Sequence, residues 1–123
     1  MKCIFVVVLA FAVLPTVTFA QSCIELMQQC RASVKIVNAP EPVPLSMAEA
    51  HSSGSCFGYI GGFVDAISVV GSTLFCAPTD STVGQDALIY LAWTDKHPDQ
   101  LHKRAGGCLA FALAEAFPCR SKK

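Results

Sequence analysis

The chain has 123 residues, of which 53% are hydrophobic, and its nine basic and nine acidic residues leave a formal net charge of zero. With a mean hydropathy of +0.49, this composition excludes an intrinsically disordered protein. It also argues against a nucleic-acid binder, because no cluster of lysines and arginines is present to contact phosphates. Seven cysteines in so short a chain instead indicate a disulfide-braced protein from an oxidising compartment.

The N-terminal segment has the features of a cleaved secretory signal peptide. Lys2 supplies a positive charge, residues 4–14 are all apolar, and residues 18–20 resemble a signal-peptidase site. An apolar run of about eleven residues is too short for a helix to cross roughly 30 Å of hydrocarbon, which argues against a retained anchor. We therefore expect residues 1–20 to be removed and residues 21–123 to form a single domain without a membrane segment.

Three helix starts are indicated by capping boxes, in which a serine or threonine is followed three residues later by glutamate or glutamine. The three pairs are Ser22/Glu25, Ser46/Glu49 and Thr82/Gln85. After the first pair, apolar residues recur at intervals of three and four up to about Val37, which predicts a helix. Residues 38–44 contain three prolines, and proline removes a backbone donor, so we expect an extended connector there.

The second predicted helix runs to about Val70 and has a small residue at every fourth position. These residues are Gly54, Gly58, Gly62 and Ala66. A glycine within a helix costs roughly 1 kcal/mol relative to alanine. The spacing therefore indicates either close packing against another helix, in the same chain or in a partner, or a helix that is interrupted near residues 52–55.

Asp65 is the one charged residue in the apolar segment 56–75. A charge in the middle of such a segment argues against a membrane span and favours a buried helix of a soluble domain. There we expect the carboxylate to be a structural group held by hydrogen bonds, with ligand binding as the alternative.

The third helix is predicted to end at about Lys96. The fourth is predicted to begin with Pro98 in its first turn and to end at about Phe117. No segment shows the alternation of apolar and polar residues that predicts a strand. The expected fold is all-α, a small four-helix domain braced by disulfides.

Patterns for catalysis or metal binding are weak in this sequence. It contains three histidines and no nucleophile-elbow, zinc-protease or P-loop motif. A Cys/His nucleophile pair is conceivable, but the six cysteines after the signal peptide are better explained as disulfides. Four polar residues around a helix junction, Asp95, His97, Asp99 and His102, lack the spacing of a zinc site and are better explained as a solvated turn. We expect no enzymatic activity, metal or cofactor.

Several short motifs occur in a fixed order along most of the chain. They are Cys56-Phe57-Gly58-Tyr59-Ile60-Gly61-Gly62 with Asp65, Phe75-Cys76-Ala77-Pro78, Gln85, His97-Pro98 with Leu101 and Ala105, and Ala112-Leu113 with Ala116-Phe117-Pro118-Cys119. In this order they resemble the Rap1a/Tai-like family of immunity proteins, which neutralise amidase effectors of type VI secretion. Cys30 also matches a cysteine usual on that family's first helix. Trp93-Thr94 replaces the family's usual Tyr-Leu, and Cys23 and Cys108 are additions to its usual four cysteines.

The resemblance implies an all-helical periplasmic homodimer that binds a secreted, papain-like peptidoglycan amidase and blocks its cleft. The function would then be protein binding, and catalysis would belong to the partner. A small secreted carrier of a lipid or another apolar ligand is the alternative, because a disulfide-braced helical scaffold suits both functions. A carrier predicts an internal cavity and no amidase partner. An enzyme of the cell envelope is a third and more remote possibility.

The six cysteines of residues 21–123 are expected to form three disulfides. The expected pairs are Cys76–Cys119, Cys30–Cys56 and Cys23–Cys108. The first pair is favoured because an up-down bundle places the end of the second helix beside the end of the fourth. The last pair follows by elimination, since Cys23 and Cys30 lie about 10 Å apart along one helix and cannot bond to each other.

Two polar loops are candidates for binding the amidase, one at residues 77–83 and the other at residues 94–99. The candidate residues are Thr79, Asp80 and Ser81 in the first loop and Asp95 and His97 in the second. Loops on a rigid scaffold are where binding residues concentrate, although both are also compatible with solvated turns. We favour the first loop, because a disulfide at Cys76 would hold it close to the bundle.

Overall fold

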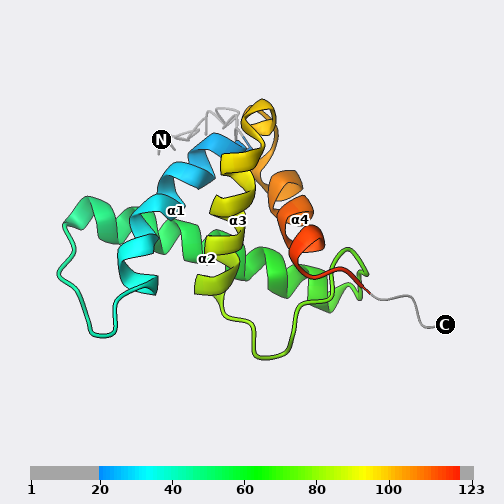
Figure 1. Ribbon diagram of the computed structural model, residues 1–123, viewed down its shortest axis with the longest axis horizontal. Coiled ribbons are helices and arrows are strands. Elements are labelled where there is room, and N and C mark those ends of the chain that lie inside the picture. Colours follow the sequence, from blue (N-terminus) through cyan, green and yellow to red (C-terminus); the bar gives the residue numbers. More distant parts are fainter. Residues whose placement is uncertain (1–19, 120–123) are drawn as a thin grey trace, which may run out of the picture.

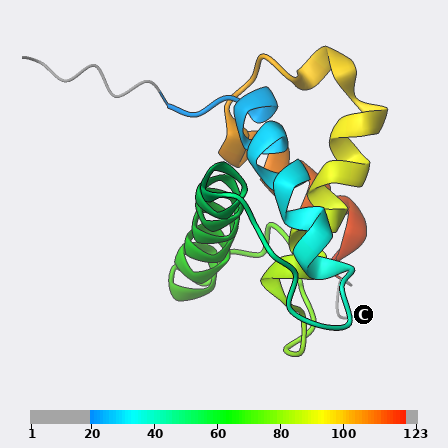
Figure 2. The same cartoon turned by 90° about the vertical axis from the view of Figure 1, so that its left-hand side faces the viewer.

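The computed structural model describes residues 20–119 and contains four α-helices, with no β-strand in that range. The helices are α1 (Cys23–Val37), α2 (Met47–Val69), α3 (Val83–Lys96) and α4 (Ala105–Ala116), and a short 3₁₀ helix, η1 (Pro98–Gln100), precedes α4. Figure 1 shows α2 lying across the other three helices, and Figure 2 shows it on one side of them. The all-α prediction is confirmed. The predicted signal peptide lies outside the described residues, apart from Ala20.

The first two predicted capping boxes are present in full. They are Ser22/Glu25 and Ser46/Glu49, in which the serine hydroxyl accepts from the glutamate N–H and the carboxylate accepts from the serine N–H. At the third start, Thr82 Oγ1 accepts from the N–H of Gln85 at 3.2 Å, but the reciprocal hydrogen bond does not form. The starts of α1, α2 and α3 were therefore predictable, because capping depends on residues that are close in sequence.

Helix α2 continues through residues 52–55, so the interruption considered there does not occur. Its core side is formed by Ser53, Cys56 and Ile60. The glycines lie on the exposed side, where a Cβ at Gly54, Gly58 or Gly62 would meet no atom within 4 Å. The expected close packing of these glycines within the chain is thus wrong, and α2, which was expected to be a buried helix, is buried on one side only. Close packing occurs instead at Gly106, where a Cβ would lie 3.3 Å from the Tyr59 hydroxyl.

The fourth helix begins at Ala105 and not, as predicted, at Pro98. The intervening backbone completes the start of α1: Cys23 N–H donates to the Lys103 carbonyl at 2.8 Å, and Ile24 N–H donates to the Leu101 carbonyl at 3.0 Å. The first N–H groups of a helix have no partner within the helix. Residues 101–104 form turns instead of a helix, and the carbonyls of Leu101 and Lys103 satisfy these donors, which no local pattern reveals.

The three disulfides join the pairs that were expected from the sequence. They are Cys23–Cys108, Cys30–Cys56 and Cys76–Cys119, with Cα–Cα distances of 6.1, 5.0 and 4.9 Å. The first joins α1 to α4, the second joins α1 to α2, and the third joins the loop after α2 to the segment after α4. Together they link every helix except α3, which packs between the others.

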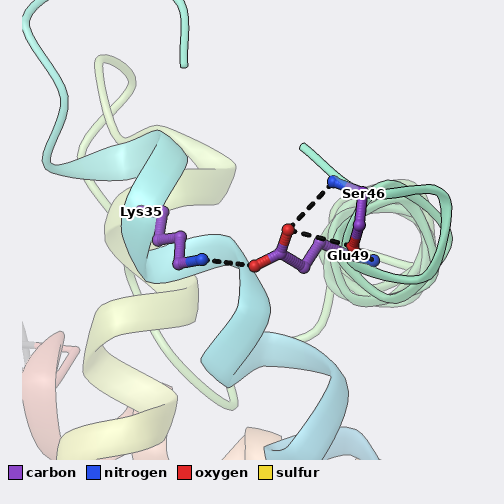
Figure 3. Close-up of polar contacts among 3 residues, drawn as sticks. All are labelled: Lys35, Ser46 and Glu49. Atoms are coloured by element: carbon purple, nitrogen blue, oxygen red, sulfur yellow. Dashed lines mark hydrogen bonds and ion pairs between the residues drawn. The ribbon is translucent and has the colours of Figure 1, made fainter. Parts of the chain in front are cut away.

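Buried side chains from all four helices form one core, which includes Leu26, Ile60, Tyr90, Leu109 and Leu113. The Tyr90 hydroxyl donates to the buried Cys23 carbonyl at 2.8 Å. On the surface, an ion pair between Lys35 and Glu49 joins α1 to the first turn of α2 (Figure 3). This hydrogen bond from Lys35, with those from Ser46, lowers the pKa of Glu49 to about 2.

Candidate binding surfaces

A groove of about 350 Å³ lies between the C-terminal part of α2, the loop that follows it and the beginning of α3; we call it the α2–α3 groove. It is lined by Val64, Asp65, Ile67, Ser68, Phe75, Cys76, Ala77, Pro78, Thr79, Ser81 and Asp86. Two of the predicted binding residues, Thr79 and Ser81, line this groove. The third residue of that loop, Asp80, is exposed beside it.

The loop that forms one wall of the α2–α3 groove is held at its start. Cys76 is bonded to Cys119, and its backbone N–H donates to the Phe117 carbonyl at 2.8 Å. Further along, Ser81 N–H donates to the Pro78 carbonyl at 3.1 Å. The polar residues between these two points are therefore presented on a loop with restrained ends.

Asp86 is a buried carboxylate that sequence analysis did not single out. It lies in the first turn of α3, is 3% exposed, and accepts a hydrogen bond from the Ser81 hydroxyl at 3.0 Å. Burial raises the pKa of Asp86, and the hydrogen bond from Ser81 opposes this effect. Its position four residues after the Thr82 cap was a usable signal, because the N-terminal turn of a helix favours an acidic residue.

Asp65 differs from the expectation for it. Its side chain is exposed, and no hydrogen-bond donor of residues 20–119 reaches its carboxylate, so it is not the buried structural group that was predicted. The reason is that α2 has an outer face, on which Asp65 lies. It contributes a second carboxylate to the α2–α3 groove.

The second predicted loop lies at the other end of α3, and its two candidate residues contact other residues of the same chain. Asp95 forms an ion pair with Arg31 of α1 at 2.8 Å. The His97 ring stacks on Trp93, with 4.2 Å between centroids, and its Nδ1 lies 2.8 Å from the Trp93 carbonyl oxygen. Because α3 has 14 residues and rises about 1.5 Å per residue, the two candidate loops are about 20 Å apart. The structure does not bring them together.

A second groove, of about 250 Å³, lies between α3 and α4. It is lined by Ile89, Ala92, Trp93, Lys96, Ala112, Glu115 and Ala116. Phe111 lies beside it, 63% exposed, with its ring 6.4 Å from that of Trp93. Sequence analysis did not single out this exposed aromatic residue.

Within the described residues, no group of three or more histidine, cysteine or acidic side chains is arranged to hold a metal ion. A search of the same residues found no helix that is both long enough and apolar enough to cross a membrane.

The fold and its surfaces place the molecule among small, disulfide-braced helical proteins with open surface grooves. Comparison with protein families is more specific: residues 22–119 match the model of the Rap1a immunity proteins, and the chain belongs to this family. Searches of curated proteins and of solved structures gave no match. Rap1a immunity proteins are not enzymes, and immunity proteins bind a cognate toxin effector. The family and the three disulfides together indicate an extracytoplasmic protein.

Proposed function

We propose that this protein is a periplasmic immunity protein that binds and inhibits a peptidoglycan amidase delivered by type VI secretion. The family match over residues 22–119 carries the proposal. Three disulfides support a periplasmic location, because disulfides form and persist in oxidising compartments. The sequence features of a signal peptide in residues 1–20 agree with export.

The loop of residues 77–83 is the proposed contact with the amidase. Thr79 and Asp80 are exposed, and the disulfide at Cys76 restrains the loop, which reduces the entropy lost on binding. Asp95 and His97 are less available, because each already contacts a neighbouring side chain. A carrier of an apolar ligand would need an internal cavity. The two grooves described above are open to the surface and therefore do not favour the carrier function.

The test uses the mature protein, residues 21–123, and the amidase effector that is sought among the products of the neighbouring genes. We expect a stable complex by calorimetry, loss of peptidoglycan cleavage at an equimolar ratio, and survival of cells that express the amidase in the periplasm together with this protein. An amidase that neither binds the protein nor is inhibited by it would overturn the proposal.

We propose further that the protein forms a homodimer through the exposed face of α2. This face is apolar at its two ends, where Met47 is 88% and Val69 is 85% exposed, and it carries the glycines along its middle. A two-fold interface must be self-complementary, so that residue i contacts residue j and j contacts i.

An antiparallel crossing centred on Gly58 meets this requirement. It places Gly54 opposite Gly62 of the second copy, and by the same symmetry it places Met47 opposite Val69 and His51 opposite Asp65. The glycines allow the backbones to approach, the apolar ends cover each other, and each imidazole faces a carboxylate. The exposed carboxylate of Asp65 would thus gain a partner in the dimer.

Charge exchange across this interface tests the pairing. H51D places two carboxylates opposite each other and should give a monomer, whereas the double variant H51D/D65H restores the pair and should restore the dimer. H102D, at an exposed position outside α2, is the control. Light scattering at tens of micromolar measures the mass, and a monomeric wild-type protein or a dimeric H51D variant would disprove this interface.

A further inference from the structure

The α2–α3 groove combines apolar walls with negative charge. Val64, Ile67 and Phe75 supply the apolar part, and Asp65 and Asp86 supply two carboxylates. None of the lining residues within the described range 20–119 is basic. Both ion pairs found among residues 20–119, Arg31–Asp95 and Lys35–Glu49, lie elsewhere on the surface.

The main support for a ligand comes from Asp86, because its carboxylate is buried and has no cationic partner among residues 20–119. One carboxylate oxygen accepts the Ser81 hydrogen bond, and no basic side chain of the described residues lies within ion-pair distance. A buried charge is costly unless it is paired and hydrogen-bonded, and a single hydroxyl with the helix N-terminus compensates only in part. The groove is the open side from which a cation can reach this carboxylate.

We propose that the α2–α3 groove receives a lysine or arginine side chain of the cognate toxin. Such a side chain has an aliphatic stem that packs on Val64, Ile67 and Phe75 and a cationic head that reaches the carboxylates. A hydrogen bond between two charged groups is about twice as strong as a neutral one. This inference rests on the proposed immunity function and names the chemistry that the inhibitory surface recognises.

The site is preformed, which favours its use in binding. Ser81 fixes the Asp86 carboxylate, and the Cys76–Cys119 disulfide fixes the start of the loop that forms the wall. The exposed Glu41, in the connector between α1 and α2, is part of neither the groove lining nor the candidate loops, so E41Q provides a control with the same change in charge.

The first experiment needs no toxin. ¹⁵N-labelled mature protein is titrated with N-acetyl-arginine amide and with its neutral analogue N-acetyl-citrulline amide, and amide shifts are followed by NMR. We expect saturable shifts at Cys76, Ser81 and Asp86 with the arginine probe, and at least about fivefold weaker binding of the neutral one. D86N should weaken arginine binding about tenfold, and E41Q should leave it unchanged. D65N is the second variant if D86N does not fold, and because Asp65 also lies in the proposed dimer interface, light scattering checks that its mass equals that of the wild-type protein. Equal binding of both probes, or unchanged binding by D86N and D65N, overturns the inference.

The second experiment separates this inference from the proposed function. The affinity of the cognate amidase is measured for wild-type protein, D86N and the control variant E41Q. If the amidase binds wild-type protein and D86N equally, the inference is wrong and the immunity function stands. If it binds no variant, the immunity function fails and the toxin is not the occupant, while the probe titration still decides whether the groove binds a cation.

The sequence itself contains one competing source of positive charge, the segment Arg-Ser-Lys-Lys at residues 120–123. A chain that ends at Cys119 should bind the arginine probe with the affinity of the full mature protein. About tenfold tighter binding by the shortened chain would assign the groove to the chain's own C-terminus and overturn its assignment to the toxin.

Discussion

The two ends of α3 both carry a polar loop near a disulfide, yet the structure uses them differently. At the end near Lys96, the polar side chains are engaged: Asp95 pairs with Arg31, and His97 stacks on Trp93. At the end near Val83, Thr79 and Asp80 are exposed and a groove opens behind them. A polar loop is therefore available for binding only where its side chains do not already form ion pairs, hydrogen bonds or stacking contacts within the fold.

The disulfides near the two ends of α3 differ in their burial. Cys23 and Cys108 are 0% and 2% exposed, and the backbone around them bonds α1 to residues 101–105. Cys76 is exposed, and its bond to Cys119 lies at the edge of the core. Cys23–Cys108, like the equally buried Cys30–Cys56, is thus part of the core of the fold, whereas Cys76–Cys119 restrains a surface loop.

The largest expected effect comes from removing the buried Cys23–Cys108 disulfide. Alanine at both Cys23 and Cys108 should lower the free energy of unfolding by about 4–5 kcal/mol, because the bond closes a long loop and its atoms fill the core. Alanine at both Cys76 and Cys119 should cost less, about 2–4 kcal/mol, but should weaken amidase binding more. Urea denaturation and calorimetry measure the two quantities. The reverse order in either one would contradict the assigned roles.

The next largest effect concerns the loops themselves. Replacing Thr79-Asp80-Ser81 with Gly-Ser-Gly should lower the affinity for the cognate amidase at least about tenfold, because the exposed contacts and the Ser81 hydrogen bond are lost. D95A and H97A, made separately, should leave affinity within about threefold and cost up to about 1 kcal/mol of stability each. Cell survival and calorimetry measure the outcome. Full protection by all three variants would mean that neither loop binds the amidase.

Two kinds of feature could be predicted from the sequence. Some depend only on residues that are close in sequence, and others, such as the disulfide pairs, have only a few possible arrangements. The capping boxes and the proline connector act over a few residues, so the starts of α1, α2 and α3 were located correctly. The disulfide pairs followed from helix order and from the length of one helix. The Thr79–Ser81 loop was identified by its polarity, and its position beside a groove was not.

The features that were missed depend on distant contacts. Pro98 is a good first residue for a helix, but α4 starts at Ala105, because the preceding carbonyls accept hydrogen bonds from α1, far away in the sequence. The position of Asp65 depends on which side of α2 faces the core, and glycine spacing alone indicated the wrong side. The burial of Asp86 depends on the loop that folds over it.

A smaller effect is expected on the pH dependence of stability, through Asp86 in the first turn of α3. Burial raises the pKa of Asp86, so the protonated form is favoured in the folded state. The stability that this contributes is present below the ordinary pKa of 3.8 and is lost as the pH rises through the raised value. Relative to D86N, the wild-type protein should therefore lose stability between about pH 3 and neutral pH. Thermal unfolding measures the difference, with D80N as the control for net charge, and an opposite trend would show that Asp86 already has a cationic partner.

The smallest effect is expected away from both ends of α3, at the ion pair between Lys35 and Glu49 (Figure 3). Glutamine at position 49 keeps a side chain that suits a capping box but removes the charge. Since the pKa of Glu49 is lowered from 4.5 to about 2, its contribution is fully present above pH 4.5 and is lost as the pH falls through about 2. The melting temperature of E49Q should lie slightly below that of the wild-type protein at neutral pH and approach it in acid.

Salt separates the ion pair from the cap in this last experiment. Exposed ion pairs are screened, so the difference between wild-type protein and E49Q should shrink at high ionic strength. Glu25 is the matched control, because it completes the other capping box and has no ion-pair partner among residues 20–119. The pKa of Glu25 is likewise lowered, in this case by hydrogen bonds from Ser22. The effect of E25Q should therefore depend on pH in the same direction but respond less to salt. Equal salt dependence in both variants would mean that Lys35 adds nothing to the cap and that α1 and α2 are held together by Cys30–Cys56 and the core alone.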